Sequence, residues 1–204
     1  MSESAVNNND SVSFGDAMKK ALRLGGTLFA VTAVTGLILG FVEHFTSQAI
    51  MKTELEARNA AFRNVIPEGS KFNPVDVIAG EETVTGVQKA ENDSGLVGWC
   101  VSVSSKGYGG ALNFVVGITK DGTVKAINIL NHSETPGLGA KSTEPEFYEQ
   151  FNDKSALPLK VVKGAANNPD EISAISGATI TSSAVTNGVN AAVEYWNKNL
   201  KGAE

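Results

Sequence analysis

The sequence of 204 residues contains little cysteine and little histidine. Its one cysteine, Cys100, excludes a disulfide within the chain and any zinc or iron–sulfur site that needs several cysteines. The two histidines, His44 and His132, offer few ligands to a metal ion, and we predict no metal site. Cys100 follows Trp99 in a strand-like run, which favours a half-buried packing role over a nucleophilic one.

Concentrated positive charge is also absent from the sequence. The 17 Lys and Arg residues are outnumbered by 22 Asp and Glu, the formal net charge is −5, and no basic run with interleaved aromatic residues occurs. Nucleic-acid binding depends on clustered basic side chains, so we expect no nucleic-acid partner. The sequence does not indicate a Ser-His-Asp set, a catalytic pair of acids or a strand–loop–helix phosphate motif.

Charge is missing altogether from Leu24 to Val42, a run of 19 residues. As a helix rising about 1.5 Å per residue, this run approximates the roughly 30 Å hydrocarbon core of a bilayer. Lys19, Lys20 and Arg23 precede it, so the positive-inside rule places the N-terminus in the cytoplasm. A cleaved signal peptide and a buried core helix are the alternatives. The length of the run, the lack of a nearby cleavage site and the flanking charges favour an uncleaved anchor.

The chain is therefore predicted to have four parts. Residues 1–23 are a cytoplasmic tail, 24–42 the transmembrane helix, 43–68 a helical stalk and 69–204 an extracytoplasmic domain. Apolar residues at near-helical spacing between Gln48 and Val65 predict the stalk helix. We expect a single-pass protein of the inner (cell) membrane, with its C-terminal domain in the periplasm or outside the cell.

The extracytoplasmic part predicts a succession of strands with helices near its end. Alternating and β-branched apolar runs indicate the strands, and apolar residues at helical spacing indicate the helices. An Asp-Gly pair between two of the runs is a strong hairpin signal. This order predicts an α+β domain with a mostly antiparallel sheet and flanking helices. The strands are expected at 75–79, 83–90, 96–104, 111–119 and 123–130, and the helices at 144–151 and 182–199.

One short motif carries the most chemical information, the sequence S-G-A-T from Ser176 to Thr179. Gly177 and Ala178 are too small to screen the Thr179 hydroxyl, and a helix is expected from about Thr181 onward. The free N–H groups and the positive dipole end of a helix favour an anion near Thr179. The alternative is an ordinary loop ending in a helix N-cap, with Thr181 or the next serine accepting from the first-turn amides.

A second segment, E-T-P-G-L-G, directly follows the predicted hairpin. Its proline fixes φ and its glycines allow positive φ, so the backbone is stiff and open enough for a ligand to approach closely. Lys141, just beyond it, would place positive charge near a bound anion. An ordinary turn between a strand and a helix is the alternative. The residues of this segment are Glu134, Thr135, Pro136, Gly137, Leu138 and Gly139.

Together the two segments resemble the FMN-binding domain family of the bacterial Rnf and Nqr electron-transport complexes. S-G-A-T is similar to the flavin attachment motif of that family, and E-T-P-G-L-G to the segment that lies against the flavin. The resemblance covers essentially the whole chain, from the N-terminal anchor to the closing helix. The short length and the single anchor look most like the G subunit of an Rnf complex, which is related to the C subunit of Nqr.

The resemblance implies one FMN per chain, attached covalently to Thr179 through a phosphoester, with Ser176, Gly177 and Ala178 beside it. It also implies that a separate flavin transferase makes this bond during maturation. The Gly-rich segment 106–110 would cover the flavin, with Tyr108 near the ring; a mobile loop between strands is the alternative.

The sequence departs from the family at Ser173, where an acidic residue is often found three positions before the S-G-A-T motif. If that carboxylate helps the transferase to grip its target, attachment would be slower in this chain. Asp170 or Glu171 would be the nearest substitutes in the sequence.

The function implied by the resemblance is an electron relay within an Rnf-type ferredoxin:NAD ion-translocating complex. Its other membrane subunits would be the partners, and this chain would carry electrons rather than act as a catalyst alone. Two alternatives remain. One is a stand-alone flavinylated electron donor to an extracytoplasmic reductase, and the other is an anchored binding or structural module without a redox role.

Overall fold

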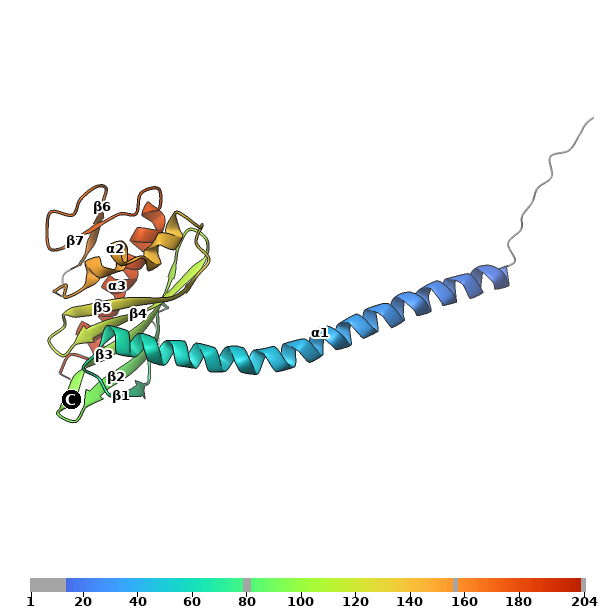
Figure 1. The fold of residues 1–204 in the computed structure, drawn as a ribbon, viewed down its shortest axis with the longest axis horizontal. Coiled ribbons are helices and arrows are strands. Elements are labelled where there is room, and N and C mark those ends of the chain that lie inside the picture. Colours follow the sequence, from blue (N-terminus) through green and yellow to red (C-terminus); the bar gives the residue numbers. More distant parts are fainter. Residues whose placement is uncertain (1–13, 79–81, 156–157, 203–204) are drawn as a thin grey trace, which may run out of the picture. The chain divides into compact units, whose positions relative to one another are not determined.

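The computed structural model describes residues 14–78, 82–155 and 158–202 (Figure 1). The chain divides into two compact units, Met1–Thr53 and Glu54–Glu204. Of the predicted cytoplasmic tail, residues 1–13 lie outside the described residues, as do the stalk side chains of Ile50 and Leu55. The predicted boundaries between tail, membrane helix, stalk and outer domain stay predictions.

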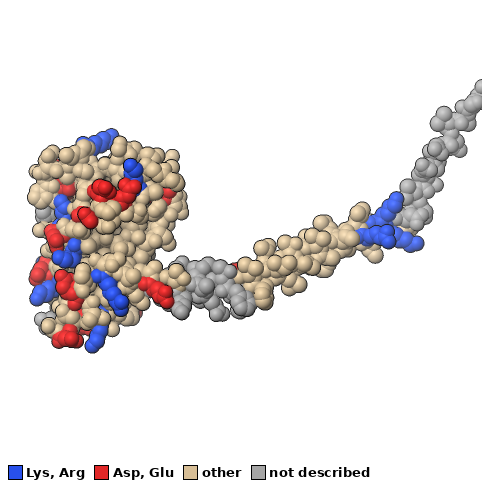
Figure 2. Space-filling view, viewed as in Figure 1, with Lys and Arg blue, Asp and Glu red and all other residues tan. Residues whose placement is uncertain are grey.

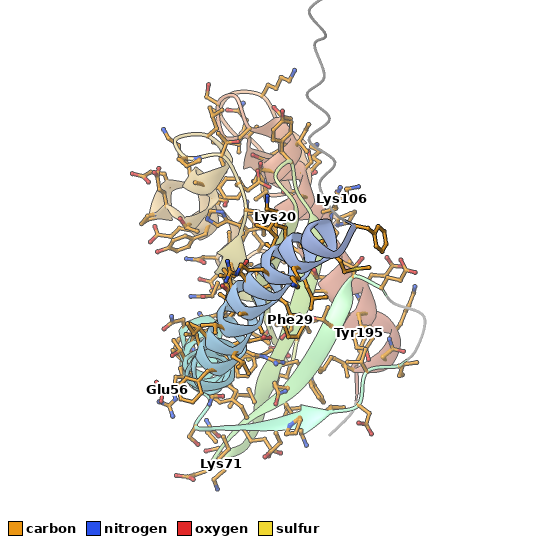
Figure 3. The ribbon with its side chains drawn as sticks, turned by 90° about the vertical axis from the view of Figure 1, so that its right-hand side faces the viewer. Lys20, Phe29, Glu56, Lys71, Lys106 and Tyr195 are labelled. Carbon is orange, nitrogen blue, oxygen red and sulfur yellow. The ribbon has the colours of Figure 1, made fainter. Side chains whose placement is uncertain are left out.

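The first unit contains most of the helix α1 (Phe14–Val65). Its stretch Met18–Glu43 is long and apolar enough to cross a bilayer, and none of it is buried in the protein. Figure 2 shows basic side chains near the start of this helix and uncharged side chains along the stretch that follows. The apolar side chains are exposed, as Phe29 illustrates in Figure 3. The run predicted from the sequence, 24–42, lies within this stretch.

Threonines inside this apolar stretch bond to the helix backbone. The hydroxyls of Thr27, Thr32 and Thr35 donate to carbonyl oxygens three or four residues earlier, at 2.8 to 3.0 Å. A hydroxyl bonded in this way leaves no unpaired donor for a hydrocarbon environment. The polar residues of the stretch are thus compatible with a membrane helix.

The second unit is built on a five-stranded sheet of the described residues with the order β1-β2-β3-β4-β5, each pair antiparallel. The α+β fold with an antiparallel sheet predicted from the sequence is confirmed. The predicted hairpin is also present, because β4 and β5 are joined by a tight turn at Gly122, whose φ is +88°. The strands are β1 (Lys71–Val75), β2 (Val84–Asn92), β3 (Gly95–Lys106), β4 (Ala111–Thr119) and β5 (Val124–His132).

Helices cover both faces of the sheet. On one face lies α3 (Thr179–Asn199), seen behind the strands in Figure 1, and it packs on alternate residues of β3 and β4 to form the larger core. A side chain at Gly188 would collide with Phe114 and Val103, so this glycine lets α3 lie close to the strands. Figure 3 shows Tyr195 on α3, and its hydroxyl accepts the backbone N–H of Ile78 at 3.1 Å.

The opposite face of the sheet carries the last turns of α1. Ala61, Phe62 and Val65 form a second core with Cys100 and Val115. Cys100 is fully buried rather than half-buried as predicted, and burial raises the pKa of its thiol to about 12. An inaccessible thiol with so high a pKa is not a nucleophile at neutral pH.

The remaining elements connect β5 to α3. They are the 3₁₀ turn η1 (Gly139–Thr143), the short helix α2 (Pro145–Tyr148), the 3₁₀ turn η2 (Glu149–Phe151), and the strands β6 (Lys160–Val162) and β7 (Glu171–Ser173). β6 and β7 pair in parallel. The sequence did not predict this pair, and it placed the first strand at 75–79 instead of at β1. Ala79 lies outside the described residues.

A hydrogen-bonded carboxylate holds the parallel pair together. Glu171 accepts the backbone N–H of Asn167 at 2.9 Å and the side-chain amide of Asn168 at 2.7 Å, and it lies 3.5 Å from Lys160 Nζ. These interactions, above all the Asn167 N–H, lower the pKa of the Glu171 carboxyl to about 2. Because an unfolded Glu titrates near pH 4.3, ionised Glu171 stabilises the fold above that pH. This contribution is lost as the pH falls from about 5 to about 2.

We therefore expect Glu171→Gln to lower the thermal unfolding midpoint at pH 7 and to reduce the loss of stability between pH 6 and pH 3. The measurement is thermal unfolding of the full chain in detergent, followed by circular dichroism at each pH. Glu149→Gln, which changes an exposed glutamate, is the matched control and should behave like the unaltered chain. An unchanged pH profile in Glu171→Gln would contradict the role of this carboxylate.

Candidate functional site

Three segments far apart in the sequence meet around one cavity of about 550 Å³. They are the loop between β3 and β4, the segment after β5, and the start of α3. The volume lies within the roughly 300–1,000 Å³ of small-molecule pockets. The lining residues are Tyr108, Glu134, Thr135, Leu138, Gly139, Gly177, Ala178, Thr179, Ile180 and Thr181.

The two motifs found in the sequence face each other directly in this cavity. Gly177 has a φ of +74°, and a Cβ built on it would lie 3.1 Å from Leu138 Cδ2. A side chain here would be strained by the backbone conformation and would press on the opposite motif. Gly177 therefore allows the turn before Thr179 to approach the segment that contains Leu138.

The start of α3 leaves backbone donors open at the cavity. Its N-cap is Ala178, which provides no side-chain cap, and the first hydrogen bond of the helix runs from Ser182 N–H to Ala178 O. The amides of Thr179, Ile180 and Thr181 thus lack an intrahelical acceptor. Thr179 is half-buried, and its hydroxyl makes no hydrogen bond with the described residues.

Thr181 and Ser182 do not act as N-caps, so the alternative of an ordinary capped helix start does not describe this turn. Ser182 Oγ accepts the N–H of Ile175 at 2.9 Å and donates to Ala178 O at 3.0 Å, so it closes the turn before the helix. Thr181 Oγ1 instead donates to a carboxylate of another segment at 2.8 Å. The first-turn amides are consequently left for another acceptor.

That carboxylate belongs to Glu134, which is only 6% exposed. Its Oε2 accepts from Thr181 Oγ1, and its Oε1 accepts the N–H of Gly109 at 3.3 Å. A Cβ at Gly107 would collide with Glu134 Oε1, and a Cβ at Gly139 would collide with Oε2 and lie 2.6 Å from Thr181 Oγ1. Glycines on two sides therefore make the space in which this carboxylate is buried.

The backbone of Glu134 is fixed as well. Its N–H donates to Nδ1 of His132 at 3.2 Å. His132 thus contributes to the site by orienting Glu134.

Four of the residues singled out from the sequence lie away from the cavity. Lys141 and Ser176 line a second cavity of about 400 Å³ on the other side of the S-G-A-T turn. Pro136 and Gly137 are exposed and line neither of these cavities. The 3₁₀ turn that begins at Gly139 carries Lys141 to the second cavity.

The residue that departs from the family pattern, Ser173, is held in β7. Its hydroxyl accepts the N–H of Ala166 at 2.8 Å, and its own N–H donates to Gln150 Oε1 at 2.7 Å. Asp170 and Glu171, the substitutes suggested by the sequence, both pair with Lys160, at 3.1 and 3.5 Å. These two carboxylates are engaged in stabilising the β6–β7 segment.

The sequence analysis did not assign Ile180 and Thr181 to the site. It expected the segment 106–110, which contains Gly107 and Gly109, to cover the flavin, but not to pack against Glu134. Thr181 was visible only as a possible cap, since its partner Glu134 is 47 residues away. Gly107 and Gly109 flank Tyr108, and their repeated spacing was the one available signal.

The cavity wall suits a flat, partly apolar ligand with an anionic tail. Leu138, Ile180 and Tyr108 provide apolar surface, and the open amides of α3 lie at the same wall as Thr179. Backbone N–H groups at a helix start are suited to phosphate. Among the described residues there is no cluster of three or more His, Cys, Asp or Glu that could hold a metal ion.

Comparison with known proteins gives concordant results. The FMN-binding domain family matches residues 107–194. The chain is 38% identical over 175 residues to the G subunit of the proton-translocating ferredoxin:NAD(+) oxidoreductase complex of Clostridium ljungdahlii, covering 82% of this chain and 91% of that protein. It is 34% identical over 192 residues to the G subunit of the Na(+)-translocating ferredoxin:NAD(+) oxidoreductase complex of Acetobacterium woodii, covering 87% and 92%.

A crystal structure shares the fold. This is the C subunit of the Na(+)-translocating NADH-quinone reductase from Parabacteroides distasonis, with a TM-score of 0.58 at 19% identity, covering 76% of this chain and 97% of that chain. At this identity the similarity concerns the fold alone.

The packing around Glu134 predicts that alanine substitution at two glycines of one segment lowers the folding stability by different amounts. Gly139→Ala should destabilise the unit by about 1–3 kcal/mol, the usual cost of overpacking, because its Cβ collides with Glu134. Gly137→Ala meets no atom within 4 Å but has a φ of +76°, so only backbone strain of about 1 kcal/mol is expected. Thermal unfolding of both variants measures the difference. Equal stability of Gly139→Ala and the unaltered chain would contradict this packing.

Proposed function

The chain belongs to the G-subunit family of ion-translocating oxidoreductase complexes, and we propose that it serves such a complex as a membrane-anchored electron carrier with FMN as its redox group. Relatives named as this subunit are 34–38% identical over more than four fifths of this chain. The match of residues 107–194 to the FMN-binding domain family supports FMN as the group.

One observation carries the proposal for the site. The E-T-P-G-L-G segment and the S-G-A-T turn line the same cavity, although they are far apart in the sequence, and Thr179 lies in its wall. A cavity lined by Leu138, Ile180 and Tyr108 with donors at one end matches a molecule with a planar ring system and a phosphate. We propose that the FMN ring lies in this cavity and its phosphate at the start of α3.

We further propose that the phosphate is esterified to Thr179, one FMN per chain, by a separate flavin transferase. The Thr179 hydroxyl has no competing hydrogen bond among the described residues, and Gly177 and Ala178 leave it accessible. The open amides at the start of α3 would stabilise the negative charge of the phosphodiester. Covalent retention suits a domain outside the membrane, where released FMN would be lost.

The protein positions the group and determines its environment. FMN supplies one- and two-electron redox chemistry when bound. The chain contributes an apolar wall, donors for the phosphate and a buried carboxylate. Tyr108 is 71% exposed and Ile180 57%, so one side of the cavity is open to a partner. We propose that donors and acceptors in the other membrane subunits approach from that side.

We propose that α1 anchors the chain with its N-terminus in the cytoplasm and the second unit on the other side of the membrane. Lys19, Lys20 and Arg23 lie at the cytoplasmic end of the apolar stretch, as the positive-inside rule requires. Glu43, at its other end, is acidic. This orientation places the proposed FMN site outside the cytoplasm.

Covalent attachment at Thr179 predicts the outcome of a single substitution. Thr179→Val, which replaces the hydroxyl by a methyl group of similar size, should abolish flavin fluorescence of the denatured protein band after co-expression with a flavin transferase. Ser94→Ala, which removes an exposed hydroxyl in the turn between β2 and β3, is the control and should stay fluorescent. A fluorescent Thr179→Val band would place the bond elsewhere. A dark band of the unaltered chain, with the transferase active on another substrate, would remove the FMN carrier proposal.

The orientation can be tested by labelling introduced cysteines with a maleimide. The native Cys100 is buried and its thiol should not react in the folded protein, so it does not interfere. Lys120→Cys, at the exposed β4–β5 turn, should be labelled in cells whose outer face is accessible to a membrane-impermeant maleimide. Lys19→Cys should be labelled only after the membrane is opened. The reverse pattern would contradict the proposed orientation.

A further inference from the structure

The cavity proposed for the flavin has one carboxylate in its wall and no basic side chain. Of the residues that line it, Glu134 is the acid, and none is Lys, Arg or His. No cationic group of the described residues forms an ion pair with Glu134, and its two hydrogen bonds come from neutral donors, Thr181 Oγ1 and Gly109 N–H. The negative charge of an ionised Glu134 is therefore not neutralised by a neighbouring cation.

The carboxylate is also closely packed. It is 6% exposed, and Gly107 and Gly139 lie close to its two oxygens. The positive end of the α3 dipole lies beside it, because Thr181 belongs to the first turn of that helix. A charge fixed in this way acts on a bound group through protein rather than through water, where its field is screened little.

The sequence predicted that Lys141 would place positive charge near the bound anion. In the structure Lys141 lines the second cavity, together with Ser176. Glu134 is thus the one acidic or basic side chain among the described residues that line the first cavity. Negative charge beside a flavin disfavours the addition of electrons.

We propose that Glu134 is a positioning and potential-setting residue that lowers the reduction potential of the bound FMN. This inference rests on the proposed function. The carboxylate makes each reduced form that gains negative charge less stable relative to the oxidised form. Through Thr181 it also fixes the first turn of α3, with Thr179 turned away from it. The carrier would then be reduced efficiently only by strongly reducing donors.

The test is redox titration of the flavin in the full chain, loaded by a co-expressed flavin transferase and kept in detergent. Glu134→Gln keeps the size of the side chain and removes the charge. We expect the midpoint potential to rise by about 59 mV, which is a tenfold change in a one-electron equilibrium. The shift should persist in high salt, because a buried charge is screened little. Glu144→Gln, which removes an exposed carboxylate at the second cavity, is the control and should leave the potential unchanged.

A second variant tests the same carboxylate by changing Thr181, the residue that donates a hydrogen bond to it. Thr181→Val removes the hydroxyl that holds the carboxylate in place, so the carboxylate is no longer fixed beside the cavity and the potential should rise as well. Thr181→Ser keeps a hydroxyl and should restore the potential of the unaltered chain. If Glu134→Gln does not fold, Thr181→Val decides the question.

Fluorescence of the denatured bands separates this inference from the proposed function. A dark unaltered chain removes the proposed function and leaves no potential to measure. Fluorescent, folded variants whose potential is unchanged or lower than that of the unaltered chain would overturn the role of Glu134. An equal rise in Glu144→Gln would also overturn it, because the effect would then be one of net charge.

Discussion

The arrangement of the site depends on the need of a buried carboxylate for hydrogen-bond donors. Glu134 is almost fully buried, and an ionised carboxylate without donors in such a place would be very costly. Thr181 and Gly109 supply the donors and so connect three segments, the loop before β4, the segment after β5 and the helix α3. On a helix of 3.6 residues per turn, positions two apart point to nearly opposite sides. Binding Thr181 inward therefore turns Thr179 away from the carboxylate.

Local patterns were sufficient to predict the parts of the fold whose interactions are local. Alternation of apolar residues located β3 and β4, and the Asp-Gly pair located the hairpin between β4 and β5, since both depend on neighbours in the sequence. β6 and β7 were missed because each is three residues long and their parallel pairing joins distant residues. β1 was displaced because it contains Pro74, which is tolerated there at the edge of the sheet.

The candidate site was partly predictable for the same reason. Its two motifs were recognised from their own residues, but their contact at Leu138 and Gly177 is tertiary. The position of Lys141 at the second cavity could not be predicted, because the direction of a side chain two residues beyond Gly139 depends on the turn that starts there. α3 begins at Thr179 without a Ser or Thr cap, so cap preferences placed its start a few residues too late. The hydrogen bond between Thr181 and Glu134 could not be predicted, because the two residues are 47 positions apart in the sequence.

The proposed effect of the fixed charge and the proposed covalent bond would have a common thermodynamic basis. A site that binds oxidised flavin more tightly than reduced flavin lowers the reduction potential by the same free energy, because the two equilibria are linked. A flavin held only by non-covalent contacts would then be bound most weakly when reduced, and would be lost from an exposed site at that moment. The proposed phosphoester at Thr179 would remove this release from the cycle, since the ring would stay tethered in both states. The carboxylate of Glu134 could then make the flavin strongly reducing, because the bond to Thr179 would keep the reduced flavin in place.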